Sequence, residues 1–181
     1  MKVVNKITKV VAKILEVCHW VGAALMVAVA ICAGVGSKDA LKHFADVGSL
    51  DGETISAYGF EVSLVNMKAL MMFAIGAVII FILVAMIFRN IYLIMKKSEG
   101  TTPFQKDNVR MVREIGIFSI AIPVVGFIMT VITRLVLGVD VIDAFDTSVN
   151  YSGFVTGIIM LSLSQIFAYG VKLEEDVDGI V

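Results

Sequence analysis

Residues 69–88 read ALMMFAIGAVIIFILVAMIF, an unbroken apolar run that is bounded by Lys68 and Arg89. A helix rises about 1.5 Å per residue, so about 20 apolar residues cross the hydrocarbon core of a bilayer. Backbone groups in lipid must be hydrogen-bonded within the protein, and a helix achieves this within one segment. The stretch therefore predicts a transmembrane helix.

Three other stretches have the same length and apolar character and carry no Asp, Glu, Lys or Arg: residues 17–35, 115–133 and 152–171. Hydrophobic residues make up 59% of the 181-residue chain and charged residues 17%, against about 45–50% and 25% in soluble domains. The mean hydropathy is +0.93. This composition excludes a disordered chain, a disulfide-stapled secreted domain and a protein that binds nucleic acid directly. It predicts an all-α membrane protein, with one domain over residues 1–181 built as a four-transmembrane-helix bundle in the lipid bilayer.

The distribution of Lys and Arg predicts the orientation of the four spans. Most of these residues lie before the first span, in the loop at residues 89–114, or at Lys172 after the last span. Because Lys and Arg are enriched in cytoplasmic segments, both termini and this loop are expected in the cytoplasm, and the loop at residues 36–68 outside. The first span is longer than a typical signal-peptide core, which favours an uncleaved span over a signal peptide.

Two segments outside the spans have their own patterns. Residues 2–16 place apolar residues on one helical face and lysines on the other, which predicts an interfacial helix that runs into the first span. It serves either as a topology signal or as a docking surface for a partner. In the outer loop, Asp51-Gly52 is a hairpin turn signal, and residues 54–64 are rich in strand formers. A small extracytoplasmic β-hairpin is expected, as a packed cover or as a sensor.

The cytoplasmic loop holds the most distinct local motif, GTTPFQ at residues 100–105. Thr102 as N-cap, Pro103 as the first helical residue and Gln105 at the third position predict a helix that begins at Pro103. Pro123 in the third span predicts a bend, either static or a hinge. The candidate interaction motif that results comprises Thr102, Pro103, Phe104, Asn108, Arg110 and Arg113. The acidic tail at residues 172–178 is either free or paired with this basic loop.

Two segments of the chain, GTTPFQKDNVRMVREIG at residues 100–116 and YGVKLEEDVDGIV at residues 169–181, carry a resemblance. Together with the four spans they resemble a bacterial four-span family known as domain of unknown function 2975. The ending resembles the family's Gly-x-x-Leu-x-Glu-Glu close, although the final Gly-Ile-Val departs from its usual Thr-containing tripeptide. The resemblance implies a multi-pass protein of the bacterial cytoplasmic (inner) membrane. It also implies signalling or regulation, since the family often accompanies small helix-turn-helix regulators, and it supplies no catalytic residue.

Polar residues within the spans are the remaining candidates, because polar groups in lipid are costly. The intramembrane candidates are His19, Ser162 and Gln165. His19 lies beside Cys18, but adjacent residues on a helix point about 100° apart, which disfavours a Cys/His nucleophilic pair. Ser162, Gln165 and Tyr169 share one helical face, either as hydrogen-bonding groups between helices or as a polar permeation path. No catalytic, cofactor or metal residues are expected.

The function predicted from these features is a non-enzymatic regulatory, sensing or partner-binding membrane protein. Its expected partner is a protein on the cytoplasmic side, and a homo-oligomer is a second expectation. One alternative is an oligomeric channel or transporter subunit, which needs a wet path past Ser162 and Gln165. The other is a membrane-embedded enzyme, which needs polar groups that converge in a cleft.

Overall fold

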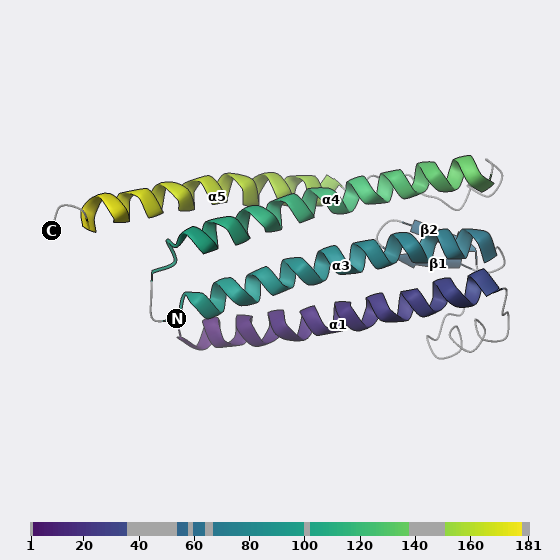
Figure 1. The fold of residues 1–181 in the computed structure, drawn as a ribbon, viewed down its shortest axis with the longest axis horizontal. Coiled ribbons are helices and arrows are strands. Elements are labelled where there is room, and N and C mark those ends of the chain that lie inside the picture. Colours follow the sequence, from purple (N-terminus) through teal and green to yellow (C-terminus); the bar gives the residue numbers. More distant parts are fainter. Residues whose placement is uncertain are drawn as a thin grey trace. The chain divides into compact units, whose positions relative to one another are not determined.

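The computed structural model describes residues 2–35, 54–57, 60–63, 67–99, 102–137 and 151–178. Its elements are, in chain order, α1 (Lys2–Val35), β1 (Thr54–Ala57), β2 (Phe60–Ser63), α3 (Met67–Lys97), α4 (Lys106–Leu137) and α5 (Tyr151–Asp178) (Figure 1). All four helices are long and apolar enough to cross a membrane. The prediction of an all-α fold with four such helices is confirmed.

Each helix continues past the apolar stretch that predicted it. The amphipathic segment before residue 17 and the first apolar stretch form one continuous helix, α1, as expected. Most of the loop expected at residues 89–114 is also helical, because α3 runs to Lys97 and α4 begins at Lys106. The connection between these two helices is therefore short. Helix α4 continues through Pro123, and a bend at this residue stays a prediction.

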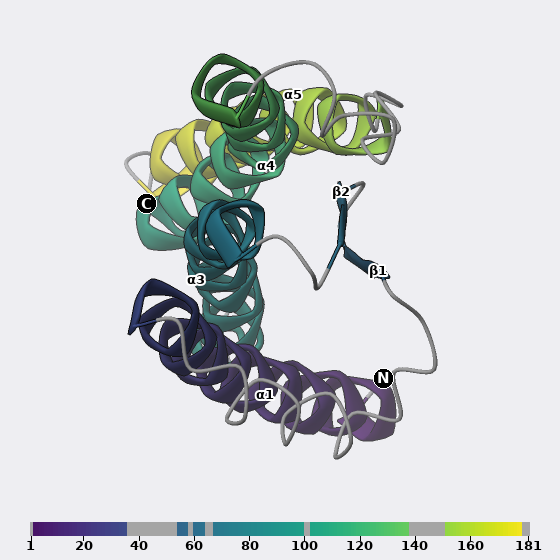
Figure 2. The ribbon, with the colours of Figure 1, turned by 90° about the vertical axis from the view of Figure 1, so that its right-hand side faces the viewer.

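The chain divides into two compact units, and each long helix except α5 contributes to both. Unit 1 contains Met1–His19, Leu83–Ile122 and Tyr151–Val181. Within it, Lys13 of α1 lies over the Tyr92 ring of α3, with 5.3 Å from Nζ to the ring centroid. Asn90 Nδ2 of α3 donates to Glu114 Oε2 of α4 at 3.0 Å. The part of α3 in unit 1 thus contacts both α1 and α4 (Figures 1 and 2).

Helices α4 and α5 approach each other within unit 1 at two glycines. A Cβ built on Gly116 would lie 3.0 Å from the carbonyl oxygen of Gly157, and one built on Gly157 would lie 2.8 Å from that of Gly116. A Cβ on Gly157 would also lie 2.4 Å from Ile120 Cγ1. The two helices therefore pack closely at Gly157, against the backbone of α4.

Unit 2 contains Trp20–Ile82 and Pro123–Asn150. Its buried residues include Leu70, Ala74 and Ile80 of α3. The strand pair also belongs to it: β1 and β2 are antiparallel, with Thr54 opposite Ser63 and Ala57 opposite Phe60 (Figure 2). The connection between the strands therefore falls at residues 58–59. The turn expected at Asp51-Gly52 precedes both strands and lies outside the described residues.

Large apolar side chains are exposed along α1, α4 and α5. Examples are Ile31 at 61%, Phe127 at 61% and Ile166 at 62% exposed. Exposing this much apolar surface to water would be unfavourable, since burying such a side chain stabilises by about 1.5–3 kcal/mol. Lipid around these helices removes that cost, so the surface agrees with the hydropathy of the helices.

Candidate functional site

The segment before α4 departs from the helical start predicted by its sequence. Helix α4 begins at Lys106, where Pro103 was expected as the first helical residue. The Pro103 carbonyl accepts the Asn108 side-chain amide at 3.0 Å and the Gln105 backbone N–H at 3.1 Å, which are not the bonds of a helical ladder. The first helical acceptor is the Gln105 carbonyl, which receives the Val109 N–H at 3.1 Å. Thr102 is not an N-cap, because its hydroxyl donates to Glu174 of α5.

The buried side chain of Asn108 holds residues 102–105 in place. Its side chain is fully buried, and Nδ2 donates to Ser98 Oγ at 3.2 Å as well as to the Pro103 carbonyl. Its Oδ1 has no hydrogen-bond partner among the described residues. One side chain thus ties the end of α3 to the residues that precede α4. Asn108 belongs to the predicted interaction motif, but its burial gives it a structural role.

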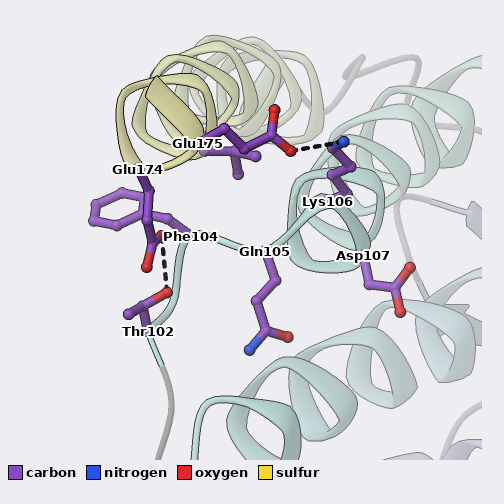
Figure 3. Close-up of a pocket in the computed structure, with 8 residues that line it drawn as sticks. Thr102, Phe104, Gln105, Lys106, Asp107, Glu174 and Glu175 are labelled. Carbon is purple, nitrogen blue, oxygen red and sulfur yellow. Dashed lines mark hydrogen bonds and ion pairs between the residues drawn. The ribbon is translucent and has the colours of Figure 1, made fainter. Parts of the chain in front are cut away.

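Phe104 forms an apolar contact with α5 at Phe167 and Gly170. The Phe104 and Phe167 ring centroids are 5.5 Å apart, with the planes tilted by 53°. A Cβ built on Gly170 would lie 2.4 Å from Phe104 Cδ1, so the ring packs directly on the α5 backbone. Residues 102–104 and residues 170–175 are far apart in the sequence, and they meet here (Figure 3).

Polar contacts surround the Phe104 contact. Thr102 Oγ1 donates to Glu174 Oε2 at 3.0 Å, and Lys106 Nζ pairs with Glu175 Oε1 at 2.7 Å (Figure 3). On the other side, Asp107 pairs with Lys97 at the end of α3. Of the two expectations for the acidic tail, the described residues therefore show the paired one. Exposed ion pairs of this kind contribute about 0–1 kcal/mol each.

The two ion pairs shift the pKa values of Lys106 and Asp107 at the start of α4. Both residues lie outside the apolar stretch at residues 115–133. The hydrogen bond and charge of Glu175 raise the pKa of Lys106 above its usual value. The hydrogen bond and charge of Lys97 lower the pKa of Asp107. Both groups therefore stay charged at neutral pH, and the surface keeps alternating charges.

These contacts border an open hollow of about 420 Å³. It is lined by Thr102, Phe104, Gln105, Lys106, Asp107, Val171, Glu174 and Glu175. Figure 3 shows Gln105 and Asp107 pointing away from α5 and Lys106 pointing toward it. The lining offers hydrogen-bond donors, acceptors and charges of both signs, but no His or Cys side chain. Such a lining can form hydrogen bonds and ion pairs with a bound molecule.

The other candidate residues lie elsewhere on the surface. Pro103, Arg110 and Arg113 are exposed, and Arg110 Nε is 3.6 Å from Glu114 Oε1. The interaction motif therefore divides into a buried anchor, two residues in contact with α5, and three residues open to a partner.

Ser162 and Gln165 are both exposed on the outer face of α5. Among the described residues, neither side chain forms a hydrogen bond to another helix, which was one of the two roles predicted for them. The other predicted role, a polar permeation path, stays a prediction. The buried polar residue on α5 is Ser164, whose hydroxyl donates to the Leu161 carbonyl at 2.7 Å.

The polar residues near the start of the first apolar stretch have local partners. His19 Nδ1 lies 2.7 Å from the Leu15 carbonyl, and its ring packs on Phe88 with centroids 5.3 Å apart. Glu16 is buried and pairs with Lys13 at 2.9 Å, while Cys18 is exposed. In the part of the chain that the structure describes, no group of three His, Cys, Asp or Glu residues is placed to hold a metal ion.

Sequence reasoning missed two contacts of this site. The pair between Asn90 and Glu114 joins α3 to α4, and its one signal was a polar residue directly after the apolar run. The packing of Phe104 on Gly170 had no signal in either segment taken alone, because the residues are far apart in the chain.

Comparisons with protein-family models, with curated proteins and with solved structures found no match to this chain.

Proposed function

We propose that this chain is a multi-pass protein of the bacterial cytoplasmic membrane with a regulatory or partner-binding role and no enzymatic activity. Its termini and the α3–α4 connection lie in the cytoplasm, where a protein partner docks on the start of α4 and the end of α5. The proposal rests on the four long apolar helices, on the excess of Lys and Arg in these segments, and on the resemblance of residues 100–116 and 169–181 to the bacterial four-span family.

One observation carries the location of the docking surface. Residues 102–104 form no helical hydrogen bonds among the described residues, yet they are fixed by Asn108 and by α5. A fixed segment loses little conformational entropy when a partner binds. The hollow and exposed Pro103 are therefore a preformed surface, and exposed Arg110 and Arg113 follow on the first turns of α4.

The chemistry of this surface favours a protein partner over a small anion. Lys106 and Lys97 are each paired closely with a carboxylate, so their charges are already balanced within the chain, while the pair between Arg110 and Glu114 is longer at 3.6 Å. A partner with both acidic and apolar side chains would match Arg110 and Arg113 together with the partly exposed Phe104.

The test is copurification from native membranes in mild detergent, followed by mass spectrometry. The double variant Arg110→Gln/Arg113→Gln is compared with Lys6→Gln/Lys96→Gln, which removes the same number of positive charges from exposed positions. We expect one stoichiometric partner with the wild type and the control, and its loss with the arginine variant. Equal recovery by both variants would contradict the docking surface.

The channel alternative now applies to an assembly of chains. Since Ser162 and Gln165 lie on the outer face of α5, a wet path past them needs several copies around a common axis. Ion or solute flux through vesicles that hold the purified protein would favour this alternative, and a loss of flux in Gln165→Leu would assign the path to α5.

A further inference from the structure

The outer face of α5 carries an uninterrupted stripe of exposed residues with a repeat of three and four. Its successive members are Val155, Ile158, Ser162, Gln165, Tyr169 and Lys172, and all are exposed. Alternating spacings of three and four residues average 3.5, which is the repeat that keeps one seam of a helix against a parallel helix. All of α5 belongs to unit 1, so the whole stripe lies within one compact unit.

Gln165 distinguishes this stripe from a face that merely contacts lipid. It lies seven residues before Lys172, which places it about 10 Å inside the apolar stretch. Its amide has no hydrogen-bond partner among the described residues. A side chain with two N–H donors and a carbonyl acceptor is costly to leave unpaired in hydrocarbon, where no water is available. The interfacial position of Tyr169 accounts for its hydroxyl, but nothing comparable accounts for Gln165.

We propose that a second copy of this chain packs on the Val155–Lys172 stripe of α5 and forms a parallel dimer with Gln165 at its centre. Copies of one chain enter a membrane in the same orientation, so their α5 helices run parallel. A two-fold axis along the membrane normal then places Gln165 opposite Gln165 of the partner copy. Each amide donates one N–H to the carbonyl of the other, so the pair gives both carbonyls and one N–H of each amide a hydrogen-bond partner.

The residues on either side of Gln165 fit the same arrangement. Ser162 is small and lies one turn from Gln165, which lets the two backbones approach closely enough for the amides to meet. Beyond the apolar stretch, the stripe continues with Lys172 and then Asp176, both exposed. In a parallel pair these oppositely charged residues occupy neighbouring layers, so Lys172 of one copy lies next to Asp176 of the other. The face is therefore self-complementary in hydrogen bonding and in charge.

This inference goes beyond the proposed docking function, because it uses a different surface and needs no other protein. The test measures energy transfer between labelled copies in lipid vesicles as the protein-to-lipid ratio is varied. We expect Gln165→Leu to weaken dimerisation about tenfold, since hydrogen bonds between membrane helices have this magnitude. Gln165→Asn keeps both donor and acceptor and should retain most of the affinity. Thr156→Val is the matched control, because Thr156 is exposed on α5 but lies away from the stripe.

Cysteine crosslinking provides a second readout that does not depend on affinity. In a Cys18→Ala/Cys32→Ala background, Ser162→Cys is expected to form a disulfide between copies, and Thr156→Cys is not. A monomeric wild type at all ratios, an unchanged affinity of Gln165→Leu, or stronger crosslinking at position 156 than at 162 would each overturn the proposal. Assemblies of three or more copies would overturn the two-fold pairing.

Discussion

Asn108 shows how a single buried side chain determines the conformation of a connection. Its amide takes the Pro103 carbonyl that a helix beginning at Pro103 would use, and it also reaches Ser98. We expect Asn108→Ala to lower the free energy of unfolding by about 1–3 kcal/mol, because two acceptors lose their buried donor. Thermal unfolding in detergent measures this loss, with exposed Arg113→Ala as control. Equal midpoints for the two variants would contradict the anchoring role.

The effect of Gly170→Ala on stability is expected to depend on whether Phe104 is present. In the wild type, Gly170→Ala would place a Cβ 2.4 Å from Phe104 Cδ1, so the ring must move and lose its contact with Phe167. Overpacking of this kind costs about 1–3 kcal/mol. In a Phe104→Ala background the space is empty, and the higher helix propensity of Ala should make Gly170→Ala neutral or stabilising by up to about 1 kcal/mol. A double-mutant cycle on unfolding midpoints measures the coupling. Additive effects would show that the ring does not pack on this glycine.

At the scale of elements, the α4–α5 crossing depends on two glycines, each of which lies close to the backbone carbonyl oxygen of the other. A Cβ at position 157 would meet the Gly116 backbone at 2.8 Å, and a helix backbone cannot yield as a side chain does. We expect Gly157→Ala to destabilise the protein by about 2–3 kcal/mol. Gly34→Ala is the matched control, since its Cβ would meet Met71 Sδ at an ordinary 3.6 Å. Similar unfolding midpoints for both alanine variants would contradict the close crossing.

The elements also differ in how far their sequence determined them. The four helices follow from local composition, because about 20 apolar residues without charge have few alternatives in lipid. The predicted start of α4 at Pro103 was wrong. The capping pattern at Thr102, Pro103 and Gln105 is local, while the hydrogen bonds that determine the helix start come from Asn108 and Glu174.

The candidate site was predicted in part for the same reason. The motif around residues 102–113 was found from its residue types. For the tail, the sequence left a free end and pairing with the basic loop both open, and the ion pair between Lys106 and Glu175 shows the second. Which members are buried and which are exposed could not be derived, since this depends on where α5 packs. The outward position of Ser162 and Gln165 likewise follows from the packing of Gly157 and Ser164 on the opposite side of α5.

At the scale of the whole molecule, the decisive quantity is the number of membrane crossings. Four helices each have the length and hydropathy for one crossing, and an even number returns the chain to the side on which it began. The lysines before residue 17 and the basic residues of the α3–α4 connection predict that this side is the cytoplasm. Single cysteines at exposed Lys6, Lys96 and Asp176, introduced in a Cys18→Ala/Cys32→Ala background, should resist a membrane-impermeant thiol reagent in intact cells and react after permeabilisation. A cysteine at position 51 is expected to react in both cases, because it falls in the predicted outer loop. Labelling of position 6 and position 176 on opposite sides would require an odd number of crossings. One of the four apolar helices would then lie outside the bilayer, where its exposed Ile and Val residues would need another partner.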